Sequence, residues 1–428
     1  MQPSSIYIGI DIGTSGIRAC AIDDAEALLS QCSQPLPSPE RDQQSVTQVV
    51  TQDAHLWWQA TTQVLRTLFS RIEVSRVRAI SVNGTSGSLL PVDSRGQPLA
   101  PALMYNHAAC VAQAHRISQL APAESAAHGA SSGLAKALYL QEKYPEARYL
   151  LHQADWILGC LCGRFGISDE NNALKTGYDP LQSRWPQWLD ALNLDLQRLP
   201  EVVPPGTRIA PLSPGLFEKL PTDCYMVSGT TDSIAAFIAT GASQPGDAVT
   251  SLGSTLVLKI ISRKPVFDAA SGIYSHKLGD YWLAGGASNT GGAVIDHYFS
   301  PAQIDALTPR LQPDHPSGLD YYPLLQPGER FPICDPRLAP RLEPRADSDV
   351  EFFQGILEGI AHIEQRGYRK LQQLGAAYPH QVETAGGGSR NPAWTQIRQR
   401  LLGVTVRQAA FSEACYGSAL LAKRGYNQ

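Results

Sequence analysis

Residues 6–23 read IYIGIDIGTSGIRACAID, and this stretch indicates how the chain begins to fold. Isoleucine recurs at positions 6, 8, 10 and 12, which is the two-residue period of a strand with one apolar face. A polar, glycine-rich tip from Gly13 to Gly16 follows, and a second apolar segment spans Ile17 to Ile22. The stretch therefore predicts a β-hairpin with a polar tip.

A comparable segment, DAVTSLGSTLVLKII, occupies residues 247–261. Val249 to Leu252 leads into a Gly253-Ser254-Thr255 tip, and Leu256 to Ile260 leads out of it. Two hairpins of one kind, far apart in the chain, favour a duplicated architecture.

The segments around these hairpins alternate between helix and strand patterns. Helices are predicted at Leu56 to Phe69 and Leu134 to Lys143, and strands at Val77 to Val82 and Cys224 to Ser228. The apolar spacing from Asp349 to Leu374 predicts a further, long helix. Alternation of this kind indicates an α/β fold.

Length and proline content suggest how the chain is divided. A chain of 428 residues exceeds one compact core, so we expect more than one domain. We place an N-terminal domain at residues 1–240 and a C-terminal domain at 241–411, and expect the last helix, 412–428, to pack back on the first. Residues 301–344 are crowded with prolines and are interpreted as a long surface excursion.

The composition excludes several classes of function. With 43% hydrophobic residues, 17% charged residues and a net charge of −4, the chain is typical of a soluble globular protein. It has no Lys/Arg-rich block, so neither a nucleic-acid nor a membrane partner is expected. Its eight cysteines include no C-x-x-C pair, and no signal sequence or spanning apolar stretch is evident. We expect a cytoplasmic protein and predict no protein partner.

The tip of the first hairpin has the groups that a phosphate site needs. Glycines at 13 and 16 free the backbone to present N–H groups to an anion, and Thr14 and Ser15 add hydroxyl donors. Asp11 cannot bind phosphate itself, but it can hold Mg²⁺ near the phosphates. A D-x-G-T pattern by itself is more often a plain turn.

A second motif, VSGTTDSIAAFIA at residues 227–239, places Asp232 where a strand pattern changes into a helical one. Aspartate is a common helix N-cap, and that interpretation stays open here. A carboxylate at such a junction is also well placed to take a proton from an attacking hydroxyl. One residue can do both.

The third motif, ETAGGGSRNPAWTQI at residues 383–397, joins a strand pattern to a helix through three successive glycines. Glycines let something flat approach the backbone closely, and a nucleoside is the obvious candidate. Asn391 would then be a polar contact and Trp394 an apolar wall. A flexible loop beside a buried tryptophan is the competing interpretation. No G-x-x-x-x-G-K-[ST] pattern occurs, which excludes a P-loop.

These three elements, in this order and spacing, resemble the FGGY family of carbohydrate kinases, which share the duplicated ATPase fold of actin, Hsp70 and hexokinase. Within that family the chain is most similar to the short ribulose/xylulose kinase-like group of cyanobacteria and plants. That similarity is carried by MYNHA at Met104, SGLAKALYL at Ser132, HQADW at His152, SDENNALKTGYDP at Ser168 and EACYGSALLA at Glu413.

The resemblance implies two RNase H-like domains with an ATP-binding cleft between them, and a sugar bound mostly by the first. It implies that Asp232 is the catalytic base and also contacts the substrate, and that Asp11 serves Mg²⁺ and substrate. Further substrate contacts are implied for Ser15, Gly16 and Ser86, and ATP contacts for Thr14, Gly253, Ser254, Thr255, Gly291, Gly387, Gly388, Asn391 and Trp394.

The sugar pocket is where the chain departs from the family. Many xylulokinases have S-G-Q-M-H-G where this chain has NGTSGS from Asn83, so Thr85 and Ser86 replace two larger residues. The family often has Asn-Asp and then an Arg where this chain has Asn106, His107 and Ala109. We interpret His107 as a solvated loop residue.

The leading hypothesis is therefore a kinase that transfers phosphate from MgATP to a ketopentose. We prefer D-ribulose, and this preference rests on the group resemblance alone. D-xylulose is the nearest alternative. A sugar-binding sensor without turnover and a nucleotide-driven switch on the same fold are the alternatives from other classes.

Overall fold

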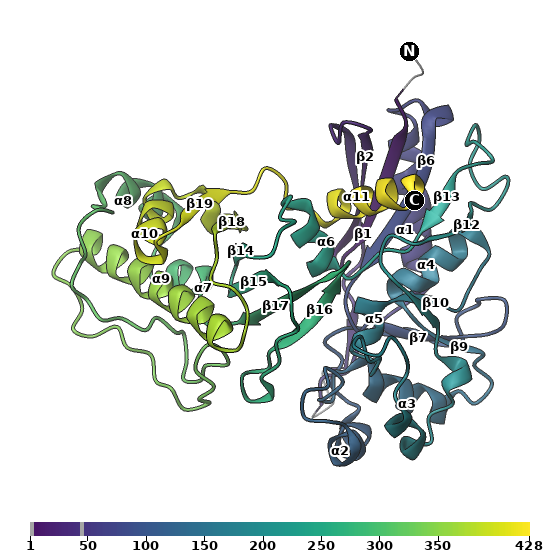
Figure 1. Cartoon of the computed structure of the whole chain (residues 1–428), viewed down its shortest axis with the longest axis horizontal. Coiled ribbons are helices and arrows are strands. Elements are labelled where there is room, and N and C mark those ends of the chain that lie inside the picture. The colour runs from purple at the N-terminus through teal and green to yellow at the C-terminus, as the bar shows by residue number, and fades with distance from the viewer. Residues whose placement is uncertain (1–3, 43–46) are drawn as a thin grey trace. The chain divides into compact units, whose positions relative to one another are not determined.

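The computed structural model describes residues 4–42 and 47–428 and contains two compact units. The first unit comprises the described residues up to Ala239 together with Glu413–Gln428, and the second is Thr240–Ser412. Each unit has α-helices packed on a six-stranded mixed β-sheet (Figure 1). The α/β class predicted from the sequence is confirmed.

The large sheet of the first unit has the strand order β12-β13-β6-β1-β2-β3. Its strands are β1 (Ile6–Ile12), β2 (Gly16–Asp23), β3 (Leu28–Pro35), β6 (Val77–Gly84), β12 (Arg208–Pro211) and β13 (Tyr225–Val227). The central strand β1 is antiparallel to β2 and parallel to β6. Every residue of β1 is buried, and this explains its unbroken apolar character apart from Asp11. The predicted first hairpin is confirmed.

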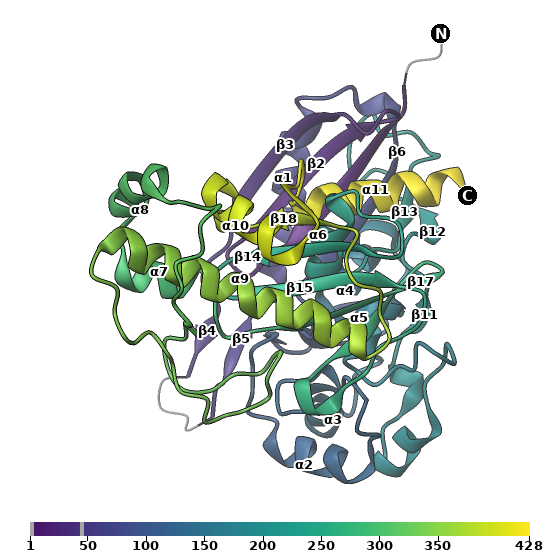
Figure 2. The same cartoon turned by 60° about the vertical axis from the view of Figure 1, so that its left-hand side comes forward.

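Four helices flank this sheet: α1 (Ala54–Phe69), α4 (Gln153–Cys162), α6 (Asp232–Ala239) and α11 (Ala414–Asn427). The last helix of the chain, α11, packs on β1, β2, β6 and α6 (Figures 1 and 2). Two glycines permit this close packing. A Cβ on Gly9 would lie 1.9 Å from the carbonyl oxygen of Cys415, and one on Gly417 would lie 1.8 Å from that of Ala235.

A smaller sheet of the first unit lies beyond the end of β6, in the order β4-β5-β8-β7-β9. These strands are β4 (Glu40–Arg41), β5 (Val50–Gln52), β7 (Leu89–Val92), β8 (Ala102–Leu103) and β9 (Tyr149–His152). The remaining elements are α2 (Val111–Leu120), α3 (Gly133–Lys143), α5 (Glu170–Leu174), the strand pair β10 (Ile167–Asp169) and β11 (Glu201–Val203), and short 3₁₀ turns. Helices α2 and α3 pack with β7, β8 and β9 in an apolar cluster that includes Leu89, Leu134 and Leu138.

The sheet of the second unit has the order β16-β17-β15-β14-β18-β19. Its strands are β14 (Asp247–Leu252), β15 (Leu256–Ser262), β16 (Tyr274–Leu278), β17 (Tyr281–Ala287), β18 (Gln381–Ala385) and β19 (Thr405–Gln408). As in the first unit, a hairpin (β14 and β15) is joined on its first strand by a parallel partner (β18). This repeated strand arrangement confirms the predicted duplication.

The helices of the second unit are α7 (Gly292–Tyr298), α8 (Pro301–Leu307), α9 (Asp349–Gln373) and α10 (Pro392–Leu402). The predicted long helix is α9, and its apolar residues at helical spacing are buried. Both views show α8 and α10 beside α9 (Figures 1 and 2). Among the described residues, no helix combines the length and hydropathy needed to cross a bilayer.

The interpretation of residues 301–344 as a surface excursion was wrong in part. Ser300 and Gln303 form a capping box, and Pro301 occupies the first turn of α8, where a proline is tolerated. Further on, Tyr321 and Phe331 are buried in the core of the second unit. The prolines interrupt regular structure, but the aromatic side chains between them still fill the core.

Candidate catalytic and nucleotide-binding residues

Two carboxylates predicted from separate motifs meet in the first unit. Asp11 lies near the end of β1 with only 5% of its surface exposed, and Asp232 is the half-buried first residue of α6. Burial, reinforced by the negative charge of Asp232, raises the pKa of Asp11 to about 7, while Arg18 acts in the opposite direction. Asp11 therefore changes charge near neutral pH.

The turn before α6 explains how Asp232 reaches this position. The Thr231 carbonyl accepts the N–H groups of Ile234 and Ala235, so Thr231, and not Asp232, precedes the helix as its cap. A Cβ on Gly229 would lie 1.8 Å from the Val82 carbonyl oxygen, so the turn passes directly over β6. The N-cap interpretation of Asp232 is corrected by one residue: its carboxylate lies at the positive end of the helix dipole.

Arg18 is a site residue that the sequence analysis missed. Its guanidinium lies 3.5 Å from a carboxylate oxygen of Asp11 and 3.7 Å from one of Glu413, and half of the side chain is exposed. Asp11 and Arg18 are register partners across the first hairpin. Counting outward from the Gly13–Gly16 tip would have found this pair.

The hairpin tip itself is tightly closed. The N–H of Gly13 donates to the Gly16 carbonyl at 3.0 Å, and the Ser15 carbonyl accepts from Leu36 N–H at 2.9 Å. The Ser15 side chain is exposed, and that of Thr14 is half-buried. Thr14, Ser15 and Gly16 thus form a compact turn that begins three residues after Asp11.

Three buried polar atoms near the predicted sugar residue Ser86 lack protein partners. Within the described part of the chain, no hydrogen bond is made by Ser86 Oγ, Asn106 Oδ1 or Gln153 Nε2. The other end of Gln153 is fixed, because its Oε1 accepts from Thr85 N–H at 3.0 Å and from Thr85 Oγ1 at 2.9 Å. Buried polar groups are normally paired, so this cluster is suited to a polar ligand.

The interpretation of His107 as a solvated residue was wrong. The side chain is only 4% exposed, and its Nδ1 accepts from Val50 N–H at 3.2 Å. Burial, followed by the nearby charge of Lys136, lowers the pKa of His107. The residue therefore packs the loop against β5, with Ala109 half-buried beside it.

The second unit contains a cavity of about 730 Å³, a size typical of small-molecule sites. Its lining includes most of the residues predicted to bind ATP: Gly253, Ser254, Gly387, Gly388, Asn391 and Trp394. Thr255 and Gly291 lie together behind that wall, since a Cβ on Gly291 would be 2.6 Å from the Thr255 Cα.

Backbone contacts hold the three glycine-rich turns of this wall together. The N–H of Gly292 donates to the Gly253 carbonyl at 2.8 Å, and Ala293 N–H donates to that of Ser254 at 3.2 Å. A Cβ on Gly386 would lie 2.6 Å from the Leu252 carbonyl oxygen, at a φ of 84°. Only glycine tolerates both the positive φ and the close approach of the Leu252 carbonyl at position 386.

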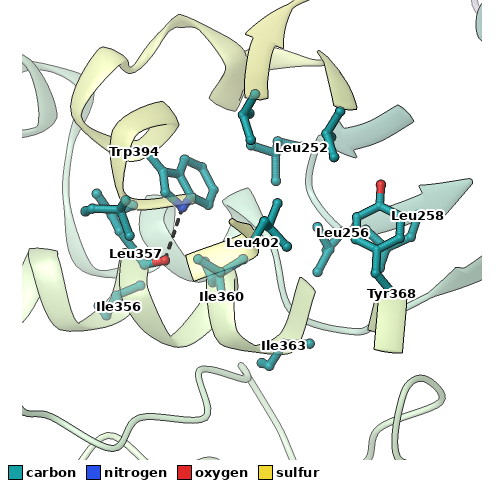
Figure 3. Close-up of a cluster of buried hydrophobic side chains, with 14 of the residues drawn as sticks. Leu252, Leu256, Leu258, Ile356, Leu357, Ile360, Ile363, Tyr368, Trp394 and Leu402 are labelled. Atoms are coloured by element: carbon teal, nitrogen blue, oxygen red, sulfur yellow. Dashed lines mark hydrogen bonds between the residues drawn. The ribbon is translucent and has the colours of Figure 1, made fainter. Parts of the chain in front are cut away.

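Asn391 and Trp394 have structural roles that the sequence did not reveal. Asn391 caps α10, accepting from Trp394 N–H at 3.0 Å and donating to Thr308 Oγ1 at 3.1 Å. Trp394 is 2% exposed, and its Nε1 donates to the Leu357 carbonyl at 3.1 Å. Figure 3 shows it packed among the leucines and isoleucines of β14 and α9. Trp394 is thus a buried core residue that also lines the cavity, and its contact with a nucleoside stays a prediction.

Charged residues at the cavity were also missed. Asp296 of α7, Asp305 of α8 and Arg390 of the turn before α10 contribute to its lining. Arg390 was visible within the third motif. The two aspartates lie in segments that showed no comparable pattern.

The residues around Asp11 fit a magnesium ion. No group of three or more His, Cys, Asp or Glu side chains suited to a metal occurs in residues 4–42 and 47–428. Mg²⁺ bound with a nucleotide needs only one or two carboxylates, because phosphate oxygens and water complete its shell. The carboxylate of Asp11, with that of Asp232 near enough to raise its pKa, meets that requirement.

Comparison with known proteins covers nearly the whole chain. Residues 6–239 match the N-terminal domain of the FGGY family of carbohydrate kinases, and residues 248–426 match its C-terminal domain. A xylulose kinase of Staphylococcus epidermidis is 22% identical over 442 residues, covering 98% of this chain and 88% of that protein. A xylulose kinase of Streptomyces rubiginosus is 26% identical over 440 residues, with 94% and 84% covered.

Among solved structures, a Brucella ovis protein described as a xyloylose kinase superposes with a TM-score of 0.88. It is 22% identical in sequence, and the match covers 99% of this chain and 90% of that one. At this identity the superposition establishes a shared fold.

Proposed function

The chain belongs to the FGGY family of carbohydrate kinases, and from that premise we propose that its substrate is a ketopentose, D-ribulose before D-xylulose. Membership establishes the coarser statement: the protein is an ATP-dependent sugar kinase with the two-domain ATPase fold of its family. The observation that carries the proposal is the meeting of Asp11 and Asp232 in the unit that holds the partnerless polar atoms.

Asp232 is the catalytic base in this proposal. The sugar hydroxyl oxygen attacks the terminal phosphorus of ATP, the bond from that phosphorus to the bridging oxygen breaks, and ADP leaves. The hydroxyl proton passes to the Asp232 carboxylate. A base matters here because the rest of phosphoryl transfer is positioning and charge neutralisation.

Asp11 and Arg18 both help to bind the charged phosphates, Asp11 through a metal ion and Arg18 directly. Asp11 would hold Mg²⁺, which supplies neutralisation of phosphate charge when bound. The Arg18 guanidinium, 3.5 Å from Asp11, is suited to a phosphate oxygen. The backbone of the Thr14–Gly16 turn and its hydroxyl groups supply further donors.

The cavity of the second unit is the proposed nucleoside site. The glycine turns bring backbone close to its wall, and apolar side chains such as Ile304 and Phe353 line it. Trp394 and Asn391 act there by shaping the wall, given their hydrogen bonds inside the protein.

The residues of the proposed sugar pocket differ from those frequent in xylulokinases. Thr85 and Ser86 replace two larger residues frequent in xylulokinases. His107, buried against β5, and Ala109 stand where that family often has Asp and Arg. The partnerless Oγ of Ser86 and Oδ1 of Asn106 are suited to sugar hydroxyls. These differences depart from the residues frequent in xylulokinases, while the preference for D-ribulose itself rests on the group resemblance.

The test is ADP release with MgATP against D-ribulose, D-xylulose, their L-forms and glycerol. We expect D-ribulose to give the highest kcat/KM. A preference for D-xylulose would show that the choice of sugar is wrong and that the assignment of kinase activity is right. A flat panel with intact ATP binding would favour the sensor or the nucleotide-driven switch.

A further inference from the structure

Lys136 of α3 is a fully buried lysine that joins three loops. Its Nζ donates to the carbonyl oxygens of Gly87 at 2.7 Å, Ser131 at 2.9 Å and Tyr105 at 3.1 Å. An ammonium group has three N–H donors, so each donor is used. The three acceptors belong to segments that are far apart in the sequence.

Two of these loops carry the partnerless polar atoms. Ser86 precedes Gly87, and Asn106 follows Tyr105. A further hydrogen bond, from Tyr105 N–H to Ser88 Oγ at 2.9 Å, joins the same two loops. Lys136 thus fixes the backbone directly beside the two side chains proposed to contact the sugar.

Stability alone is a poor reason for a charge at this position. All three acceptors are backbone carbonyls, and the charged or titratable groups that face Lys136 are His107, Cys110 and Lys175. Burial lowers the pKa of Lys136 to about 7, with the charge of Lys175 acting in the same direction. Burying an ammonium is costly, and such groups are concentrated at functional sites.

We propose that Lys136 is a positioning residue for sugar binding. Its ammonium holds residues 85–88 and 104–107 in one arrangement, so that Ser86 Oγ and Asn106 Oδ1 reach the sugar hydroxyls together. It does not touch the reacting atoms. This inference rests on the proposed function, because it takes the partnerless atoms to be sugar contacts.

The test compares Lys136→Met with Lys143→Met, a matched change at an exposed lysine of the same helix. We expect Lys136→Met to raise the KM for D-ribulose at least tenfold and to leave the KM for ATP within twofold. The melting-temperature rise that D-ribulose causes in the wild type should also shrink. Lys143→Met should match the wild type in both KM values.

A purely structural role gives a different pattern. If Lys136→Met lowers the melting temperature but leaves the KM for D-ribulose within twofold, or changes both KM values equally, the inference is wrong. Should Lys136→Met fail to fold, Lys136→Gln, which keeps two N–H donors, is judged by the same criteria. If the wild type is inactive on every sugar, both the proposed function and this inference are wrong.

Discussion

At the scale of single residues, Asp11 and Asp232 are the proposed catalytic carboxylates of the first unit. Burial and the negative charge of Asp232 both oppose the ionisation of Asp11. The folded protein therefore favours the neutral form of Asp11, with a pKa of about 7 against about 3.9 in an unfolded chain. That difference makes stability depend on pH.

Asp11→Asn removes this dependence. In the wild type, stability from this group is fully present below about pH 4 and is lost as pH rises to about 7. The variant should be more stable than the wild type above pH 7, by at most about 4 kcal/mol at roughly 1.4 kcal/mol per pKa unit. This figure already includes the opposing effect of Arg18 on the pKa of Asp11.

Urea unfolding of the wild type and of Asp11→Asn at pH 4.5 and pH 8 measures this difference in stability. The advantage of Asp11→Asn should be close to its maximum at pH 8 and fall to roughly a quarter of that value at pH 4.5. An equal effect at both pH values would show that Asp11 is ionised throughout this range in the folded protein.

At the same scale, the burial of individual polar residues could not be predicted from the sequence. His107 and Lys136 look like loop and surface residues in the sequence, because a single polar residue has no periodic pattern that reveals its environment. Both are buried through tertiary contacts with segments far away in the chain. Trp394 was singled out correctly, but its bond to Leu357 depends on the packing of α10 against α9.

At the scale of elements, glycine-rich turns position the backbone around the cavity of the second unit, the proposed nucleoside site. These turns were predictable, because the period-two pattern of each strand ends directly at its glycines. The contacts between these turns were not predictable, because the strand order and the hydrogen bond between Gly253 and Gly292 involve segments that are distant in the sequence.

A comparison of Gly386→Ala with Gly403→Ala tests whether the Gly386–Gly388 turn belongs to the nucleotide site. Both positions have positive φ, 84° and 71°, but a Cβ meets the Leu252 carbonyl only at Gly386, whereas Gly403 faces open space. We expect Gly386→Ala to raise the KM for ATP at least tenfold, because the turn must shift. Gly403→Ala should lose only about 1–2 kcal/mol of stability to backbone strain.

Steady-state kinetics and thermal unfolding on both variants decide the point. Equal KM values for ATP in Gly386→Ala and Gly403→Ala would contradict the assignment of the Gly386–Gly388 turn to the nucleotide site.

At the scale of the whole molecule, the chain crosses from the first unit to the second and returns with its last helix. α11 covers β1, β2 and β6 and places Glu413 beside Arg18. A chain ending at Ser412 therefore exposes the face of the central sheet of the first unit. The second unit, Thr240–Ser412, keeps all its elements in that chain.

We expect the truncated chain, residues 1–412, to lose D-ribulose binding and the cooperative unfolding of the first unit. Nucleotide binding by the second unit should persist, because the residues that line its cavity are all present. Calorimetric titration with ATP and with D-ribulose checks both. Retained sugar binding would show that α11 is dispensable for the first unit.

The most direct test of the account is the turnover of Asp232→Asn, which keeps the size of the side chain and removes its capacity to accept the hydroxyl proton. kcat with D-ribulose and MgATP is measured beside the Kd values for both ligands. The account predicts a fall in kcat of at least about a hundredfold, as for loss of a general base, with both Kd values within about threefold of the wild type. A variant that retains most of its turnover would contradict the assignment of Asp232 as the base.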